Sequence, residues 1–389
     1  MKLTKLSLVA ALAVSSAFAG GDIAPVEPVV EAPVVEAAAC NSNTTINGKA
    51  VLYSFTSDDY GALDWYKGNS SALGAAVTLD VSHKITDNVT ANVTAVGFTN
   101  LTNSYDNGGA WGYFESEETG AYLNIANITA AYGDTTFVLG RQLLDTPMIQ
   151  SFDWLLAPGS FEAYTVVNKS ISNLTLVGSY IEAYRMNGSG TDFADLDGDN
   201  WTVGASYSDA FDASVWYYNV DAVAPLNPDQ YTQIYADAGV ELAGIKLAAQ
   251  YVDTDYDVVD DSTAYGVKAE TTLAGFDLAA AYVNVDDAPA GFVDWDGLYT
   301  SMWMTPTSIS VGDNFMVSAA TEFSGLSVSA AYGDFEYENV GTEGGSEFDL
   351  ILGYGVTDCI SLDAAYTITD YGDGSGDEQV MELIATYKF

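Results

Sequence analysis

The sequence is poor in basic side chains. Its 389 residues include 11 lysines and arginines against 54 aspartates and glutamates, a formal net charge of −43 at pH 7. Phosphate backbones would repel a chain this acidic, which excludes nucleic acid as a partner. The acidic surplus has two interpretations: a solvated surface that keeps the protein soluble, or a vestibule that concentrates cations.

Long apolar runs and catalytic residue sets are also missing. No segment after the amino terminus offers about eighteen consecutive apolar residues, so the sequence predicts no transmembrane helix. The one histidine, His83, lies in Val81-Ser82-His83-Lys84 and is expected to be an ordinary strand residue rather than a base. No Ser/His/Asp set or metal-ligand spacing stands out. We therefore expect a protein that is not an enzyme and requires no cofactor.

The apolar residues that are present come as short alternations. Hydrophobic residues make up 48% of the chain, which also contains 26 tyrosines. Many of these tyrosines stand at the ends of the alternating segments, as in a membrane barrel with aromatic girdles.

The amino-terminal region has the pattern of an export signal. Lys2 and Lys5 precede an apolar stretch that ends in Ala17-Phe18-Ala19, so we predict a signal peptide at residues 1–19. Residues 20–44 are acidic and rich in proline and valine, which indicates a periplasmic lead-in rather than a domain.

Residues 379–389 show the alternation of a membrane strand. One face carries Leu383, Tyr387 and Phe389, and the other face is mostly polar. Such alternation over about ten residues fits a tilted strand that crosses a bilayer. Because this strand ends the chain, its simplest partner is the first strand, which would close a barrel.

Short glycine turns recur between alternating segments. Three similar units contain Leu242-Ala243-Gly244-Ile245, Leu273-Ala274-Gly275-Phe276 and Phe323-Ser324-Gly325-Leu326. Glycine in such a tight connection indicates a hairpin. With weaker turns included, residues 45–389 are expected to be all-β: a transmembrane antiparallel β-barrel of about eighteen strands, with short periplasmic turns and long extracellular loops. A soluble β-sandwich or solenoid, the competing architecture, would not need alternating loop lengths.

The third long loop, residues 143–160, differs from the others. It is apolar and contains Pro147 and Pro158, whereas the other loops are acidic and glycine-rich. An apolar loop exposed to water would be a liability, so we expect this loop to fold into the lumen and narrow it. Burial against neighbouring loops or a partner subunit is the alternative. The seventh loop, with Trp295 and Trp303, has the same ambiguity.

Motifs around the third loop resemble a known family. They are Gly140-Arg141-Gln142, Leu144-Asp145-Thr146-Pro147, Phe161-Glu162-Ala163 and Val167-Asn168-Lys169-Ser170. This segment resembles the outer membrane porin D type and is most similar to the campylobacterial major outer membrane porins. The resemblance implies a barrel of about eighteen strands, often trimeric, whose third loop constricts a diffusion channel lined on one wall by a ladder of basic residues.

The chain has too few basic residues for a full ladder. Arg185 shares strand parity with Thr175 and Ser179 and is expected to point inward, whereas Arg141 shares parity with the apolar Phe137. We therefore expect a cation-preferring or weakly selective pore. The candidate residues of the pore and its constriction are Arg141, Asp145, Asp153, Glu162, Lys169 and Arg185.

Two further sites are expected away from the constriction. Cys40 and Cys359 would both lie at the periplasmic rim, where an oxidising compartment favours a disulfide; the alternatives are two unpaired thiols or a lipidated Cys40, although no lipobox precedes it. Asp195, Asp197 and Asp199 resemble a calcium-binding run without its distal glutamate. A weak calcium site there stands beside the simpler interpretation of a solvated acidic loop.

The expected function is a porin of the bacterial outer membrane that passes small hydrophilic solutes and ions. A surface structural or adhesive barrel, whose long loops bind a partner, is the alternative. The expected partners are outer-membrane lipid and lipopolysaccharide, two further copies in a homotrimer, and the outer-membrane assembly machinery, which would recognise the strand ending at Phe389.

Overall fold

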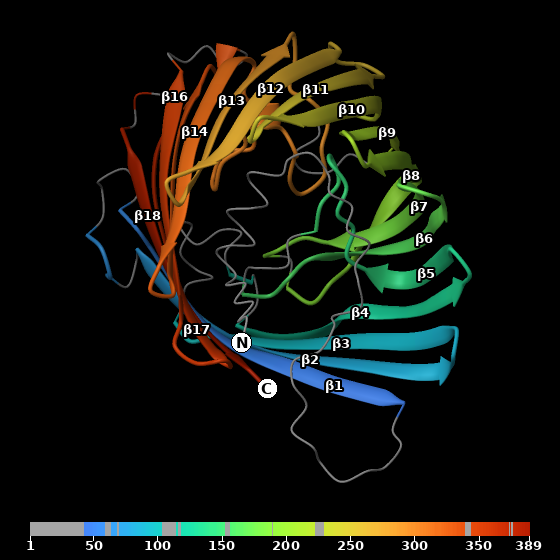
Figure 1. Ribbon diagram of the computed structural model, residues 1–389. Helices are drawn as coiled ribbons and strands as arrows, with labels where there is room; N and C mark the ends of the chain where they lie inside the picture. The colour runs from blue at the N-terminus through green and yellow to red at the C-terminus, as the bar shows by residue number, and fades with distance from the viewer. Residues whose placement is uncertain are drawn as a thin grey trace.

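The wall of the molecule is one closed antiparallel sheet (Figure 1). The computed structural model describes residues 43–58, 64–67, 70–102, 114–115, 118–151, 156–188, 190–221, 229–338, 344–372, 374 and 376–389. Within these residues, eighteen strands each pair with the strands before and after them in sequence, and β1 also pairs with β18. The antiparallel barrel predicted from alternation and turn spacing is confirmed.

The strands, in chain order, are β1 (Thr44–Ser57), β2 (Ser71–Thr86), β3 (Val89–Asn100), β4 (Thr119–Tyr132), β5 (Thr135–Gln142), β6 (Ser160–Ile171), β7 (Leu174–Arg185), β8 (Ala194–Ser208), β9 (Asp212–Val220), β10 (Tyr231–Leu242), β11 (Ile245–Tyr256), β12 (Ser262–Leu273), β13 (Phe276–Asp286), β14 (Gly312–Phe323), β15 (Leu326–Phe335), β16 (Gly345–Gly355), β17 (Ile360–Asp370) and β18 (Glu378–Lys388). A single 3₁₀ turn, η3 (Thr307–Ile309), lies in the described part of the β13–β14 connection. The described residues contain no helix with the length and apolar character that crossing a membrane requires.

Tight turns fix the strand register at one end of the barrel. At Ala243-Gly244 the two φ angles are 55° and 81°, and at Ala274-Gly275 they are 54° and 85°. Positive φ at both central residues is the geometry of a type I′ turn, whose twist matches that of the paired strands. Glycine adopts the second position without steric cost, which is why the glycine pattern located these hairpins correctly.

The outer face of the wall is apolar. In β18, Leu383 and Tyr387 are exposed, whereas Glu382 and Ile384 are buried. Around the barrel, exposed aliphatic side chains lie between two sets of exposed aromatic residues. One set lies beside the tight turns: Tyr132, Phe211, Phe276, Phe323, Tyr354, Tyr387 and Phe389; the other lies towards the long connections: Tyr164, Tyr180, Tyr251, Tyr265, Phe315 and Tyr332. An aliphatic belt between two aromatic girdles is the surface that a barrel presents to a bilayer.

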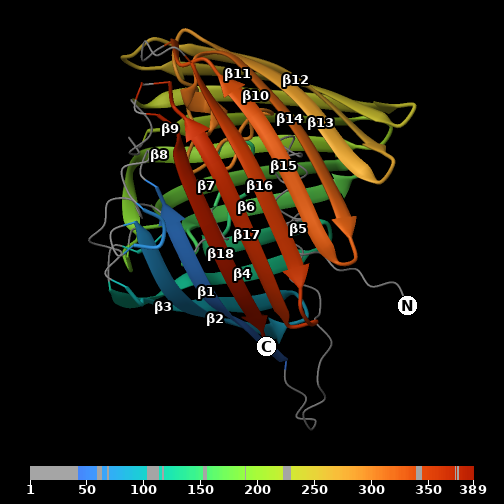
Figure 2. The ribbon, with the colours of Figure 1, turned by 90° about the vertical axis from the view of Figure 1, so that its left-hand side faces the viewer.

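The seam between β1 and β18 closes the barrel. Their register runs from Lys49 opposite Lys388 to Ser57 opposite Val380, and Figure 2 shows these strands lying side by side, tilted as closure requires. Beyond the last strand residue, the Phe389 N–H donates to the Gly48 carbonyl at 2.9 Å. The carboxyl-terminal residue therefore takes part in closing the wall.

Only one of the two cysteines, Cys359, lies among the described residues. Cys359 is exposed in the turn before β17, and its carbonyl accepts the Lys388 N–H at 2.8 Å, beside the seam. Cys40 lies outside the described residues, so the disulfide between them stays a prediction.

Candidate functional site

Two long connections run inside the ring of strands and pair with each other. In Figure 1 the β5–β6 connection lies in green and the β13–β14 connection in orange within the ring. Met148 accepts the Val293 N–H at 2.9 Å, and Val293 accepts the Gln150 N–H at 3.2 Å. A Cβ on Gly297 would lie 2.7 Å from the Pro147 carbonyl oxygen, so the two backbones are in close contact. We call residues 144–151 and 289–305 together the inner bar.

One side of the inner bar is attached to the wall at β9–β11. The Tyr218 hydroxyl lies 3.3 Å from the Met148 N–H that donates to it. Gln233 donates its amide to the Gly291 carbonyl at 2.8 Å, and the Tyr256 hydroxyl donates to the Pro289 carbonyl at 2.9 Å. All of these wall groups are uncharged.

The other side of the inner bar is attached to carboxylates on β16 and β18. Trp303 donates its indole N–H to Glu382 at 2.7 Å and its backbone N–H to Asp349 at 3.2 Å. The Met304 N–H and the Thr305 hydroxyl donate to the two oxygens of Glu347, at 2.7 and 2.5 Å. The inner bar therefore extends from one part of the wall to another across the interior.

Two aspartates within the inner bar are buried. Asp296 accepts hydrogen bonds from the N–H groups of Leu298 and Ser308, each at 2.9 Å, and from the Ser301 hydroxyl. These bonds hold residues 296–308 of the β13–β14 connection together. Burial raises the pKa of Asp296, and it raises the pKa of Asp294 to about 8. Asp294 Oδ2 has no hydrogen-bond partner within the described residues, so Asp294 favours its neutral form at pH 7.

Arg185 lies in a buried cluster of loops and has no exposed charge. Its relative exposure is 0%, and its guanidinium lies 2.6 Å from Glu115. It also donates to the carbonyls of Gly190, at 2.6 Å, Ala157, at 3.2 Å, and Pro158, at 3.1 Å. Burial raises the pKa of Glu115, and the nearby guanidinium opposes that rise. Arg185 thus joins the end of the third loop to the fourth.

A β-bulge lies in β7 before Arg185. In the pairing of β6 with β7, Ala163 and Glu162 lie opposite Ile181 and Ala183, so Glu182 is an extra residue on β7. A bulge adds one residue to a strand and reverses the alternation beyond it, so a count from Thr175 and Ser179 does not extend to Arg185.

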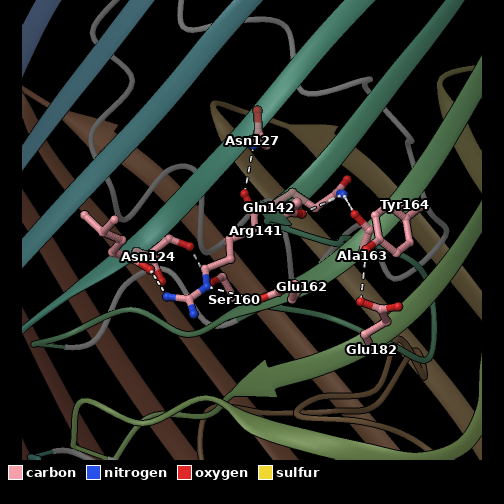
Figure 3. Close-up of polar contacts among 11 residues, drawn as sticks. Asn124, Asn127, Arg141, Gln142, Ser160, Glu162, Ala163, Tyr164 and Glu182 are labelled. Carbon is pink, nitrogen blue, oxygen red and sulfur yellow. Dashed lines mark hydrogen bonds and ion pairs between the residues drawn. The ribbon is translucent and has the colours of Figure 1, made fainter.

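Arg141 and Glu162 form an ion pair with each other on the wall (Figure 3). Arg141 Nε lies 3.2 Å from Glu162 Oε2, and its Nη1 donates to the Leu123 carbonyl at 3.1 Å. Arg141 belongs to the same alternate series as the exposed Leu139, and Glu162 to that of the exposed Tyr164. The pair therefore lies on the outward face, near the exposed aromatic residues towards the long connections, and its two charges balance each other.

Of the remaining candidate constriction residues, Asp145 and Lys169 are described, and they lie in different parts of the structure. Asp145 is exposed on the inner bar. Lys169 is exposed at the tight-turn end of β6, in the alternate series that contains the buried Ala163 and Thr165. Asp153 lies outside the described residues. Whether these side chains line the narrowest point stays a prediction.

The three aspartates of the expected calcium run lie on a strand. Asp195, Asp197 and Asp199 are exposed on β8, which begins at Ala194, several residues before the expected end of the fourth loop. Asp199 accepts the Tyr180 hydroxyl at 3.2 Å. In the part of the chain that the structure describes, no three His, Cys, Asp or Glu side chains are grouped as metal ligands. Calcium binding here stays a prediction.

On the inward face of the strands, carboxylates outnumber basic side chains in the central part of the wall. Lys246 lies 3.8 Å from Asp212, and Lys268 lies 3.2 Å from Glu270, so each of these lysines faces a carboxylate. Further carboxylates stand on the inward series of the strands: Asp80, Asp237, Glu347, Asp349, Asp363 and Glu382. Fixed negative charge around an enclosed space raises the local concentration of cations.

The carboxylates that hold the inner bar were missed by sequence reasoning. Glu347, Asp349 and Glu382 are each flanked by residues of the outward series, so alternation alone could have placed them inside. Their partners could not have been found this way, because Trp303 is 46 residues from Asp349 and 79 from Glu382 in the chain.

The closed wall, its apolar outer belt and the chain segments within it define a transmembrane β-barrel of the outer-membrane class. No protein-family model and no curated protein matches the chain. Among solved structures, the chain is similar to OccK8 (OprE) of Pseudomonas aeruginosa, with a TM-score of 0.74 and 16% identity over 89% of this chain and 98% of that one.

Two further solved structures give the same result. OccAB2 of Acinetobacter baumannii has a TM-score of 0.73 and 15% identity, over 89% of this chain and 98% of that one. The outer membrane protein OpdK of Pseudomonas aeruginosa has a TM-score of 0.72 and 15% identity, over 89% of this chain and 99% of that one. At these identities, the similarity shows a shared fold along nearly the whole of each chain.

Proposed function

We propose that this protein is a porin of the porin D type that forms a water-filled channel in the bacterial outer membrane for small hydrophilic solutes and ions. The observation that carries the proposal is the inner bar, because it occupies the interior of a closed wall and narrows it without being part of the sheet. A barrel of about this strand number is too wide for its wall side chains to fill. The fold shared with the outer membrane protein OpdK supports the same interpretation.

A cation preference is the second part of the proposal. It is supported by the excess of carboxylates on the inner wall and by the pairing of Lys246 and Lys268 with acids. The ladder of bases implied by the family resemblance would need unpaired arginines or lysines, and Arg185 is buried and paired. Charged side chains around a pore select ions of opposite sign.

Liposome swelling tests the channel, and a reversal potential tests its selectivity. Reconstituted protein should let small sugars enter liposomes quickly and larger ones progressively more slowly. No swelling above that of empty liposomes would reject the channel. In a potassium chloride gradient across a planar bilayer, the reversal potential should have the sign of a cation-preferring pore. A value of the opposite sign would reject the cation preference alone.

The alternative function, a surface structural or adhesive barrel, is less well supported because an adhesin has no need of a bar inside its wall. The remaining partners are also part of the proposal: outer-membrane lipid and lipopolysaccharide around the apolar belt, a homotrimer, and the assembly machinery at the β18 end. The similarity to campylobacterial porins rests on the motifs in residues 140–170.

A further inference from the structure

The two attachments of the inner bar differ in chemistry. On the β9–β11 side, the partners of the bar are the Tyr218 hydroxyl, the Gln233 amide and the Tyr256 hydroxyl. On the other side, Trp303, Met304 and Thr305 donate to the carboxylates of Glu347, Asp349 and Glu382. A bond to a carboxylate is about twice as strong as a neutral one, so the second attachment is strong for as long as its donors stay in place.

No basic side chain among the described residues pairs with the acidic attachment. Glu347 and Asp349 are 0% and 4% exposed, and Glu382 is 0% exposed. Within the described residues, none of the three takes part in an ion pair, and their hydrogen-bond donors include those of the bar. A buried carboxylate without hydrogen bonds is costly, so the wall acids and the tip of the bar stabilise each other.

Glu382 contacts the bar through a side chain, the indole of Trp303. One of its oxygens accepts the Trp303 indole N–H at 2.7 Å, and the other accepts the Tyr53 hydroxyl at 2.5 Å. Tyr53 lies on β1, so this carboxylate connects the bar to the strands of the barrel seam. The indole N–H is a side-chain donor and can be removed without altering the backbone.

The bar has a second support that would survive the loss of the first. Its attachments to Tyr218, Gln233 and Tyr256 lie on other strands, and Asp296 holds the connection together internally. Release of residues 303–305 from the wall carboxylates would therefore free one end of the bar while the remainder stays attached.

We propose that residues 303–305 and the carboxylates of Glu347, Asp349 and Glu382 form a latch that positions the inner bar, and that opening this latch widens the channel. The inference rests on the proposed channel function and deepens it by assigning residues that set the width of the passage. Glu382 is a positioning residue here because it acts through Trp303. Loss of one hydrogen bond to a buried carboxylate should raise the released fraction of the bar by about tenfold.

Single-channel recording of a double-mutant cycle tests the latch. Trp303→Phe removes the indole donor and keeps an aromatic ring, and Glu382→Gln removes the carboxylate with little change in volume. Each variant should show a higher mean conductance and more frequent transitions between current levels than the wild-type channel. The double variant should go no further than the larger single effect, because Glu382→Gln weakens the same bond that Trp303→Phe removes. Trp201→Phe, which changes an outward-facing residue that pairs with Tyr217, is the matched control and should behave as wild type.

The outcomes separate this inference from the channel function. Wild-type protein that gives no current steps would reject the channel. Folded variants whose conductance and current noise equal those of wild type, or whose effects simply add, would overturn the latch. If Trp303→Phe or Glu382→Gln does not yield a heat-modifiable barrel, Thr305→Val replaces them: it removes the hydroxyl that donates to Glu347 and leaves the wall unchanged. That variant should also raise conductance, and wild-type behaviour in it would overturn the latch equally.

Discussion

At the scale of single residues, the two arginines of the candidate site have different environments. Arg185 is fully buried with Glu115, whereas the side chains of Arg141 and Glu162 are 30% and 37% exposed. The desolvation of a buried pair is offset only while both partners are present. An exposed pair is screened by solvent and contributes little. The same residue type therefore has a structural role in one place and a minor one in the other.

Arg185→Met should destabilise the barrel by about 3–5 kcal/mol, because it leaves Glu115 buried without its partner. Arg141→Met, the matched control, should cost less than about 1 kcal/mol. Urea unfolding in detergent micelles, followed by tryptophan fluorescence, measures both. Equal effects of the two substitutions would contradict the assignment of Arg185 as the centre of the loop cluster.

At the scale of elements, the alternation of side chains and the glycine turns were sufficient to predict the strands. Both signals are local: exposed Leu383 and Tyr387 define one face of β18, and Gly244 or Gly275 fixes a turn. The third loop stood out because its apolar composition is unlike that of the other loops. The bulge before Ala183 could not be predicted, since it depends on the pairing of β7 with β6.

The contacts of the inner bar were beyond sequence reasoning for another reason. The pairing of Met148 with Val293 joins two connections that are far apart in the chain. Their relative position is set only when the barrel has closed, and no periodicity within either connection carries that information. The carboxylate partners of residues 303–305 depend on the same closure.

The docking of the β13–β14 connection should depend on pH through Asp294. Its pKa is raised from 3.8 to about 8 by burial, so the folded state retains a proton that the free segment loses. The stability that this group contributes is fully present below about pH 4, declines above it, and is lost as the pH rises through about 8. Docking should therefore weaken from pH 6 to pH 9.

Limited proteolysis of the reconstituted protein at pH 6, 7.5 and 9 measures this change. Asp294→Asn has no proton to lose and serves as the control at each pH, which also corrects for the pH dependence of the protease. Cleavage within residues 287–311 should rise with pH in the wild type relative to the variant. Parallel cleavage rates in the two proteins would contradict the prediction.

At the scale of the whole molecule, closure depends on the last residue as well as on the paired strands. Gly48 and Phe389 exchange backbone hydrogen bonds of 2.8 and 2.9 Å. A Cβ on Gly48 would lie 2.5 Å from the Phe389 ring, so the ring covers this glycine at the seam. An aromatic side chain over a strand glycine protects a site that would otherwise pair weakly.

Deletion of Phe389 should lower the yield of assembled barrel without abolishing expression of the chain. The deletion removes both the ring over Gly48 and two backbone bonds at the seam. Heat-modifiable migration on gels, compared with total protein by immunoblot, measures the assembled fraction. Phe276→Ala is the control, because Phe276 is exposed at the same end and away from the seam. An unchanged assembled fraction after the deletion would count against the seam role.

A closed barrel with a bar inside it should be an open channel. Current across a planar bilayer, recorded after the purified protein is added, measures whether the channel is open. The current should rise in discrete, uniform steps that persist under a constant voltage, each from the insertion of one assembly. A bilayer that stays electrically silent with folded, heat-modifiable protein present would contradict it.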